Sequence, residues 1–152
     1  MCGIVGYIGG KDALPVLLEG LKNLEYRGYD SSGVGVIPHG SGKVLIRKEQ
    51  GKIRQLEDML SAKPLPTAHI GIAHTRWATH GAPCRKNSHP HTNEKATISV
   101  VHNGIIENYQ TLKAALIGKG YRFSSDTDTE VIVHLIDEYF EGDLVKAVQR
   151  TI

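Results

Sequence analysis

The sequence predicts a single domain of the α+β class, in which strands and amphipathic helices follow one another along the chain. Two observations carry this prediction. Short β-branched runs bounded by glycine occur at the start of the chain and again further along it, as is typical of strands. Between them, leucines and isoleucines repeat at the i, i+3, i+4, i+7 spacing of a helix with one apolar face. A length of 152 residues suits one domain and is too short for two of ordinary size.

The chain opens with a predicted strand and helix. Residues 2–9 are apolar, β-branched and bounded by glycine, which predicts a buried strand. A helix is expected to begin after Asp12, a residue type that caps helix N-termini, and to end near Arg27 and Gly28.

A hairpin and a short helix are predicted next. Residues 34–37 and 43–48 flank a glycine-rich turn and are expected to pair as antiparallel strands. Ile53, Leu56 and Leu60 then share one face of a short amphipathic helix.

Two further strands are predicted at residues 69–75 and 97–102. The polar stretch between them, residues 76–96, is long for a loop in a compact domain. Loops of that length are usually functional, which directs attention to this part of the chain.

Three helices complete the prediction. The first carries Tyr109 and stops at Gly118. Residues 127–130 have the Thr-x-x-Glu pattern of a capping box and lead into the second helix. A last helical pattern begins at Leu144.

Charge and composition exclude several kinds of partner. The 18 basic and 16 acidic side chains give a net charge of +2, so neither a nucleic-acid-binding stripe nor an acidic tail is indicated. No apolar run approaches the ~20 residues of a membrane span, and no signal peptide is recognisable. A cytoplasmic protein with a small neutral or zwitterionic ligand, and without membrane or nucleic-acid partners, is therefore expected.

Cys2 is the position with the most chemical meaning. After removal of Met1, Cys2 would carry a free α-amino group with a pKa near ~8 beside its thiol, so one residue would hold both a base and a nucleophile. The alternative is a buried apolar filler, because free cysteines are often buried. Position alone leaves both interpretations open.

Metal binding is disfavoured. The two cysteines form no CxxC pair, and the HExxH spacing is absent. Six of the eight histidines nevertheless fall in one stretch of the chain: His69, His74, His80, His89, His91 and His102. We expect His74 and His102 to be hydrogen-bonded at strand ends, and His80 and His89 to lie in the long loop, where they could line a pocket.

Five further residues have both a functional and a structural interpretation. Arg76 offers a planar fork for a carboxylate and Trp77 a wall, whereas a structural salt bridge is the alternative that most arginines satisfy. Asn103 and Gly104 are either a turn, which the pair taken alone favours, or two donors for an oxyanion. Asp128 precedes a predicted helix, and stabilisation of the helix N-terminus explains it without a ligand.

The combination and order of these motifs is far more specific than any one of them. Residues 1–6 resemble the start of the class II glutamine amidotransferases, whose N-terminal cysteine hydrolyses glutamine. Within that class the chain resembles the glucosamine-6-phosphate synthases, also called glutamine–fructose-6-phosphate aminotransferases. The motifs that carry this resemblance are residues 24–33, 74–81, 88–91, 101–109 and 125–131.

The resemblance implies a role for each motif residue. Cys2 would attack the side-chain amide of L-glutamine and form a thioester, with its own α-amino group relaying protons. Asn103 and the backbone N–H of Gly104 would form the oxyanion hole. Arg76 would bind the α-carboxylate of the substrate, and Asp128 its α-ammonium group.

Other motif residues would build the pocket. A loop at residues 76–84 would close over the substrate, and Arg27 would support the nucleophile. Cys84 matches no functional position and is interpreted as incidental. The residues implied to line or cover the pocket are Trp77, Thr79, His80 and His89. The resemblance implies no cofactor and no metal.

The resemblance also implies an αββα sandwich of the N-terminal-nucleophile hydrolase type. Relatives carry a longer glutaminase domain followed by sugar-isomerase lobes that bind fructose 6-phosphate. We therefore expect residues 1–152 to be a truncated glutaminase domain, incomplete at its C-terminus, of an enzyme that is a homodimer at full length. The alternatives are another class II glutamine amidotransferase and a catalytically inactive glutamine-binding fragment.

Overall fold

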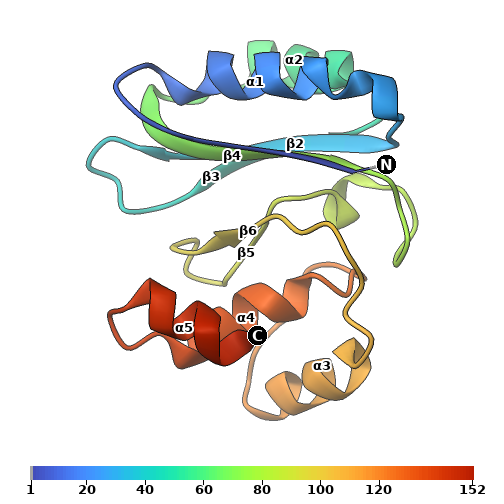
Figure 1. The fold of residues 1–152 in the computed structure, drawn as a ribbon, viewed down its shortest axis with the longest axis vertical. Helices are drawn as coiled ribbons and strands as arrows, with labels where there is room; N and C mark the ends of the chain where they lie inside the picture. Colours follow the sequence, from blue (N-terminus) through green and yellow to red (C-terminus); the bar gives the residue numbers. More distant parts are fainter. Residues whose placement is uncertain (1) are drawn as a thin grey trace.

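Four layers follow one another through the molecule: a pair of helices, a four-stranded sheet, a two-stranded sheet and a further group of helices (Figure 1). The computed structural model describes residues 2–152, to which every statement about elements refers. The order helix, sheet, sheet, helix is the αββα arrangement of the N-terminal-nucleophile fold. The predicted α+β class is therefore confirmed.

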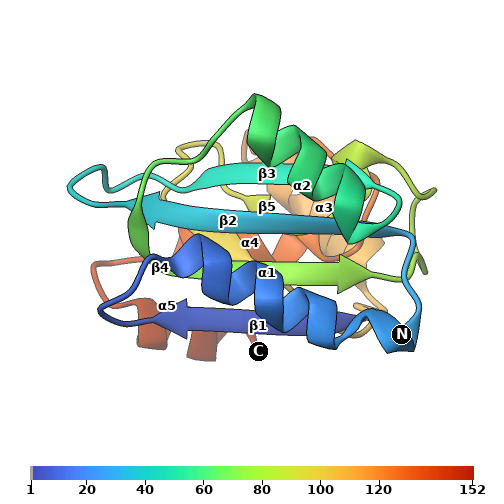
Figure 2. The ribbon, with the colours of Figure 1, turned by 90° about the horizontal axis from the view of Figure 1, so that it is seen from above.

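The large sheet is antiparallel throughout, with strand order β1-β4-β2-β3 (Figure 2). Its strands confirm the predicted opening strand, the hairpin and the strand expected at residues 69–75; they are β1 (Gly3–Ile8), β2 (Ser31–Pro38), β3 (Leu45–Gln50) and β4 (Ala68–Arg76). The expectation that the first strand is buried was wrong for one of its faces. Because β1 lies at the sheet edge, Ile4 and Ile8 are exposed, and only the opposite face packs against a helix.

Helices α1 (Ala13–Asn23) and α2 (Ile53–Ala62) cover the outer face of this sheet (Figure 2). Leu17 and Leu56 are fully buried there, as the helical spacing predicted. The expected cap at Asp12 was correct in position only. Its carboxylate accepts a hydrogen bond from Ala68 N at 3.2 Å, so it links the helix start to β4.

The expected α1 end point was slightly too far along the chain. The α-helix ends at Asn23, and a 3-10 turn, Glu25–Arg27, leads to Gly28.

The second sheet is short. It consists of β5 (His91–Thr92) and β6 (Ser99–Val100), so the predicted strand at 97–102 was too long. The cause is local: the Asn93 side-chain oxygen accepts hydrogen bonds from the backbone N–H groups of Thr97 and Ile98. Those groups are thereby removed from strand pairing.

Helices α3 (Tyr109–Gly118), α4 (Glu130–Tyr139) and α5 (Leu144–Thr151) form the last layer and confirm the three predicted helices. The predicted capping box was wrong. The Glu130 carboxylate accepts from Ser124 N and Ser125 N, upstream of the expected partner, because the chain folds back along the helix start.

An apolar groove of about 580 Å³ lies between the inner face of the large sheet and the helical layer. Ile70 and Ile72 line it from β4, Val100 from β6, and Phe140 and Leu144 from the helical side. Across residues 2–152, no helix has both the length and the apolar character that crossing a membrane requires.

Candidate active site

The antiparallel register brings three separate segments to one end of the large sheet. Gly3 pairs with Thr75, and Ser31 pairs with Arg76, so β1 and β2 both begin where β4 ends. Cys2 therefore lies beside the loop that follows β4. The segment that precedes β2 lies on the other side of that loop.

A cavity of about 360 Å³ opens at this end of the sheet. Every residue to which the resemblance gave an individual role in the site lines it except His80. The lining residues that were singled out are Cys2, Arg27, Arg76, Trp77, Thr79, His89, Asn103, Gly104 and Asp128. Residues that sequence reasoning did not place in the site also line it: His74, His102, Ile105 and Thr129.

Cys2 is half-buried, and its sulfur is positioned by backbone. The N–H of Trp77 donates to Cys2 Sγ at 3.1 Å, and the thiol in turn lies 3.7 Å from Trp77 O. The indole of Trp77 is 56% exposed and forms an outer wall. The filler interpretation of Cys2 fails, because the side chain faces a cavity rather than the apolar core.

Arg76 is buried, with one half of its guanidinium committed to the loop. Its Nη2 donates to the carbonyl oxygens of His80 and Gly81. Its Nη1 is buried and has no hydrogen-bond partner among residues 2–152, and no carboxylate in that range forms a salt bridge with it. The structural salt bridge is thus absent from the described chain, and the unused nitrogen can serve a ligand carboxylate.

Asp128 is also buried, although it lies at the start of α4. Its Oδ2 accepts a hydrogen bond from Ile106 N at 2.8 Å and lies 4.0 Å from His80 Nδ1. The carboxylate therefore holds the segment after Gly104 and faces the cavity, so helix stabilisation alone does not explain it.

Asn103 and Gly104 do not form a hairpin turn, because a helix follows them rather than a paired strand. Asn103 Nδ2 donates to Cys2 O at 3.4 Å, and Asn103 Oδ1 lies 2.8 Å from His74 Nε2. A Cβ at Gly104 would come within 2.8 Å of the His102 ring. Glycine is needed for this close approach, which leaves the backbone N–H beside the cavity uncovered.

Burial lowers the pKa of three histidines, His74, His89 and His91. It lowers the pKa of His74 to about 4 and that of His91 to about 3, with nearby positive groups adding to the effect for both. Burial also lowers the pKa of His89 far below its usual range. Within residues 2–152, no group of three or more His, Cys, Asp and Glu side chains is arranged to hold a metal ion.

Two residues fall outside the cavity lining. His80 lies next to Asp128, with 4.0 Å between His80 Nδ1 and Asp128 Oδ2. Its ring packs against that of Tyr109 in a T-shaped arrangement, with 5.4 Å between the ring centroids. Cys84 contributes its carbonyl oxygen, which accepts from Asn87 N and Ser88 N. Removal of Met1 concerns a residue outside the described range.

Besides the lining residues His102, Ile105 and Thr129, sequence reasoning missed the roles of His74 and Asp30. His74 shares a strand face with Arg76, since residues two apart in a strand point the same way, and that spacing could have indicated it. The Asp30 carboxylate accepts from Ala78 N, next to the Trp77 backbone that contacts Cys2. Only the strand register reveals that second contact.

This geometry agrees with the comparisons to known proteins. A family model described as a glutamine amidotransferase domain matches residues 61–149, more than half of the chain. The chain therefore belongs to the glutamine amidotransferase domain family.

The relatives and solved structures extend this assignment. Glutamine–fructose-6-phosphate aminotransferase (isomerizing) of Clostridium tetani is 59% identical over the whole chain, and that of Aquifex aeolicus is 55% identical over the whole chain. The chain spans 24% and 25% of these two proteins. A solved glutamine phosphoribosylpyrophosphate amidotransferase from B. subtilis, complexed with ADP and GMP, matches 99% of the chain and 32% of its own length, with TM-score 0.79 and 26% identity. The resemblance to this family and its fold is therefore confirmed.

Proposed function

We propose that residues 1–152 are a glutaminase domain that hydrolyses L-glutamine to glutamate and ammonia through Cys2. One observation carries the proposal. A single cavity brings the Cys2 thiol together with two oxyanion donors and with two buried, oppositely charged groups, Arg76 and Asp128. Family membership and the names of the relatives support the same reaction.

The two charged groups suit a free amino acid. Arg76 Nη1, which has no hydrogen-bond partner within residues 2–152, is the donor for the α-carboxylate, and Asp128 is the carboxylate for the α-ammonium group. Both side chains are buried, so the pairing forms where water competes poorly. The substrate side chain then extends toward Cys2.

The first half of the reaction is attack by sulfur. The Cys2 thiol gives its proton to the α-amino group of Cys2 as the sulfur bonds to the amide carbon of glutamine. The carbonyl oxygen becomes an oxyanion bound by Asn103 Nδ2 and Gly104 N. Collapse of this intermediate breaks the C–N bond, and the α-ammonium group returns its proton to the leaving ammonia, which leaves a thioester.

Hydrolysis of the thioester reverses these steps with water. The oxygen of a water molecule bonds to the thioester carbon while the α-amino group of Cys2 takes a proton from that water. The same donors bind the second oxyanion. Breaking the C–S bond releases glutamate and restores the thiol. Each oxyanion donor is worth about 2.7–4 kcal/mol in comparable enzymes.

We further propose that the ammonia serves glucosamine 6-phosphate synthesis from fructose 6-phosphate in a longer polypeptide. The printed names of the relatives support this acceptor, and the chain spans about a quarter of their length. A homodimer at full length and a cytoplasmic location belong to the same proposal, as does the absence of a metal or cofactor. Another class II amidotransferase is less well supported, because the phosphoribosylpyrophosphate enzyme is only 26% identical.

Glutaminase assays and calorimetric titration of one preparation test the proposal. The wild-type chain is expected to release glutamate from glutamine, and Cys2→Ala to release none while still binding glutamine through its charged anchors. Arg76→Lys is expected to weaken binding, because a lysine cannot reproduce the planar fork. A folded wild-type chain that binds glutamine without hydrolysing it would instead establish the inactive-fragment alternative.

A further inference from the structure

The segment that carries the two oxyanion donors has no regular secondary structure of its own. Residues 101–106 lie between β6 and α3, and neither element includes them. Side chains from distant parts of the chain fix this segment instead. His89 Nδ1 accepts from His102 N at 3.4 Å, and Asp128 accepts from Ile106 N at 2.8 Å.

Asn103 itself is fixed by His74. Its Oδ1 lies 2.8 Å from His74 Nε2, and an amide oxygen can only accept a hydrogen bond, so Nε2 carries the proton and donates. His74 is fully buried on β4, and its Nδ1 has no partner among residues 2–152. A neutral ring is therefore most stable with its one proton on Nε2, where an acceptor is present.

The plane of the His74 ring is fixed as well. The His89 ring stacks on it at 4.3 Å between centroids and 27° between planes. These two stacked rings bond to consecutive residues of the oxyanion segment, His102 and Asn103. The stack thus sets both the position of the segment and the direction of one side chain in it.

An asparagine amide has two ends of opposite character, so its orientation decides whether it stabilises or repels an oxyanion. With Oδ1 bound to His74, Nδ2 is directed toward Cys2, where it already contacts Cys2 O. The reversed amide would place Oδ1 against the developing negative charge and would leave His74 Nε2–H facing N–H groups.

We propose that His74 is a positioning residue that holds the Asn103 amide with its donor end toward the oxyanion. The inference rests on the proposed glutaminase function and adds a residue that acts through Asn103 without touching substrate. His74 is neutral at pH 7, because burial lowers its pKa to about 4, so it orients the amide by hydrogen bonding and not by charge.

Steady-state kinetics of five purified variants test this role. His74→Leu removes the donor and is expected to lower kcat between about tenfold and a hundredfold, less than the roughly hundredfold to thousandfold loss when an oxyanion donor itself is removed, with KM for glutamine changed less than about twofold. His74→Gln keeps an N–H at a similar reach and is expected to restore kcat to within about tenfold of wild type. His69→Leu is the matched control, an exposed histidine on the same strand, and is expected to leave kcat unchanged.

The last two variants, Asn103→Ala and the Asn103→Ala, His74→Leu double variant, separate positioning from general structural damage. In an Asn103→Ala background, adding His74→Leu is expected to lower kcat by less than about threefold further, since the amide that His74 orients is already gone. Full additivity of the two losses, or a His74→Gln enzyme as impaired as His74→Leu, would overturn the inference.

A measurement that does not depend on catalytic activity distinguishes this inference from the proposed function. Nitrogen-15 NMR of the wild-type chain is expected to show His74 as a neutral ring protonated at Nε2, and an Nδ1-protonated or charged ring at pH 7 would contradict the inference. An inactive wild-type chain with an Nε2-protonated His74 would refute the glutaminase and leave the hydrogen bond standing.

Discussion

The two halves of the molecule differ in the kind of side chain that they bury. The four-stranded sheet with α1 and α2 encloses an apolar cluster that includes Leu17, Leu21 and Leu56, and every member of that cluster lies in the first half of the chain. The second half, β5 and β6 with α3 to α5, buries a few apolar residues, among them Leu116, Val131 and Val133, but buried polar side chains outnumber them. The buried polar side chains include Asn87, Ser88, His89, His91, Asn93, Ser125, Thr127, Asp128, Glu130 and His134.

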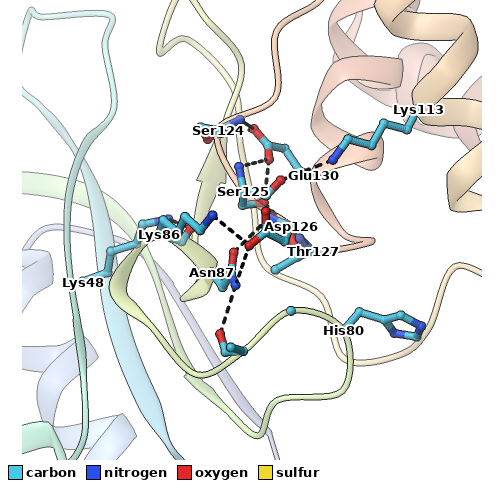
Figure 3. A network of polar contacts seen from close by, with 12 residues as sticks. Lys48, His80, Lys86, Asn87, Lys113, Ser124, Ser125, Asp126, Thr127 and Glu130 are labelled. Carbon is cyan, nitrogen blue, oxygen red and sulfur yellow. Dashed lines mark hydrogen bonds and ion pairs between the residues drawn. The ribbon is translucent and has the colours of Figure 1, made fainter.

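The polar contacts of the second half form a continuous network (Figure 3). Asn87 is fully buried and accepts from Asp126 N at 2.9 Å, which joins the long loop to the segment before α4. Ser124 and Ser125 donate to the Glu130 carboxylate. The active-site cavity lies where the two halves meet. The apolar half therefore supplies most of the stability, and the polar half fixes the geometry of the site, because hydrogen bonds are directional and apolar contacts are not.

The largest stability effect is expected in the apolar half. Leu17→Ala leaves a cavity beneath the sheet and should lower the free energy of unfolding by about 2–5 kcal/mol. Leu144→Ala, at a leucine of the second half that is 53% exposed, is the surface control and should cost about 1 kcal/mol. Urea denaturation measures both, and equal losses would contradict the stabilisation attributed to apolar burial beneath the sheet.

Acid should lower the stability of the fold through His74, which lies where the two halves meet. The pKa of His74 is about 4 when folded and 6.5 in its ordinary state, so between these values the unfolded chain binds the extra proton. Stability is therefore full above pH 6.5 and falls as the pH drops toward 4, by up to about 3 kcal/mol from this residue.

Unfolding free energies measured across this pH range check that sign. The His74→Gln variant should show a shallower fall than wild type, because its side chain does not titrate. An identical slope in both proteins would show that His74 does not carry the effect.

Removing the negative charge of Glu130 from the polar network should lower the free energy of unfolding by a smaller amount and only locally. Burial alone would raise the pKa of Glu130, but the His134 ring, with Nε2 3.6 Å from Oε1, and hydrogen bonds from Ser124 and Ser125 hold it far below its usual range. Glu130→Gln weakens those bonds and should cost about 2 kcal/mol. Hydrogen exchange should accelerate in α4 while the amides of β2 and β4 stay protected. Uniform acceleration would mean that the halves unfold as one unit.

The smallest effect is expected at the surface of the apolar half. Lys22 and Glu57 join α1 to α2 at 2.6 Å, with both side chains substantially exposed. Lys22→Ala should cost less than about 1 kcal/mol in low salt and less still in high salt. A loss as large as that of Leu17→Ala, measured by the same urea titration, would contradict the apolar origin of stability in this half.

The same contrast explains what the sequence could predict. Helices and strands of the apolar half follow the spacing of residues such as Leu17, Leu56 and Val34, so periodicity located α1, α2 and the hairpin. The site residues came from motif resemblance, and the strand register explains why Cys2 and Arg76 meet.

The remaining features depend on specific side-chain hydrogen bonds, some between near neighbours in the sequence and some between distant residues. Asn93 shortens β6 by accepting from nearby N–H groups, and Glu130 bonds to serines outside the expected box. The partner of His74 lies 29 positions away in the chain. Periodicity contains no information about such contacts, because each is decided by the three-dimensional arrangement of polar side chains.

Intact-mass analysis of the chain after treatment with an electrophilic ketone analogue of glutamine tests the proposed chemistry most directly. Cys2 and Cys84 are both half-buried, so Cys84 serves as an internal control for nonspecific alkylation. We predict a chain without Met1 that gains one adduct, mapped to Cys2 and blocked by excess L-glutamine. An adduct on Cys84 alone, or a chain that keeps Met1 and still releases ammonia from glutamine, would contradict the account.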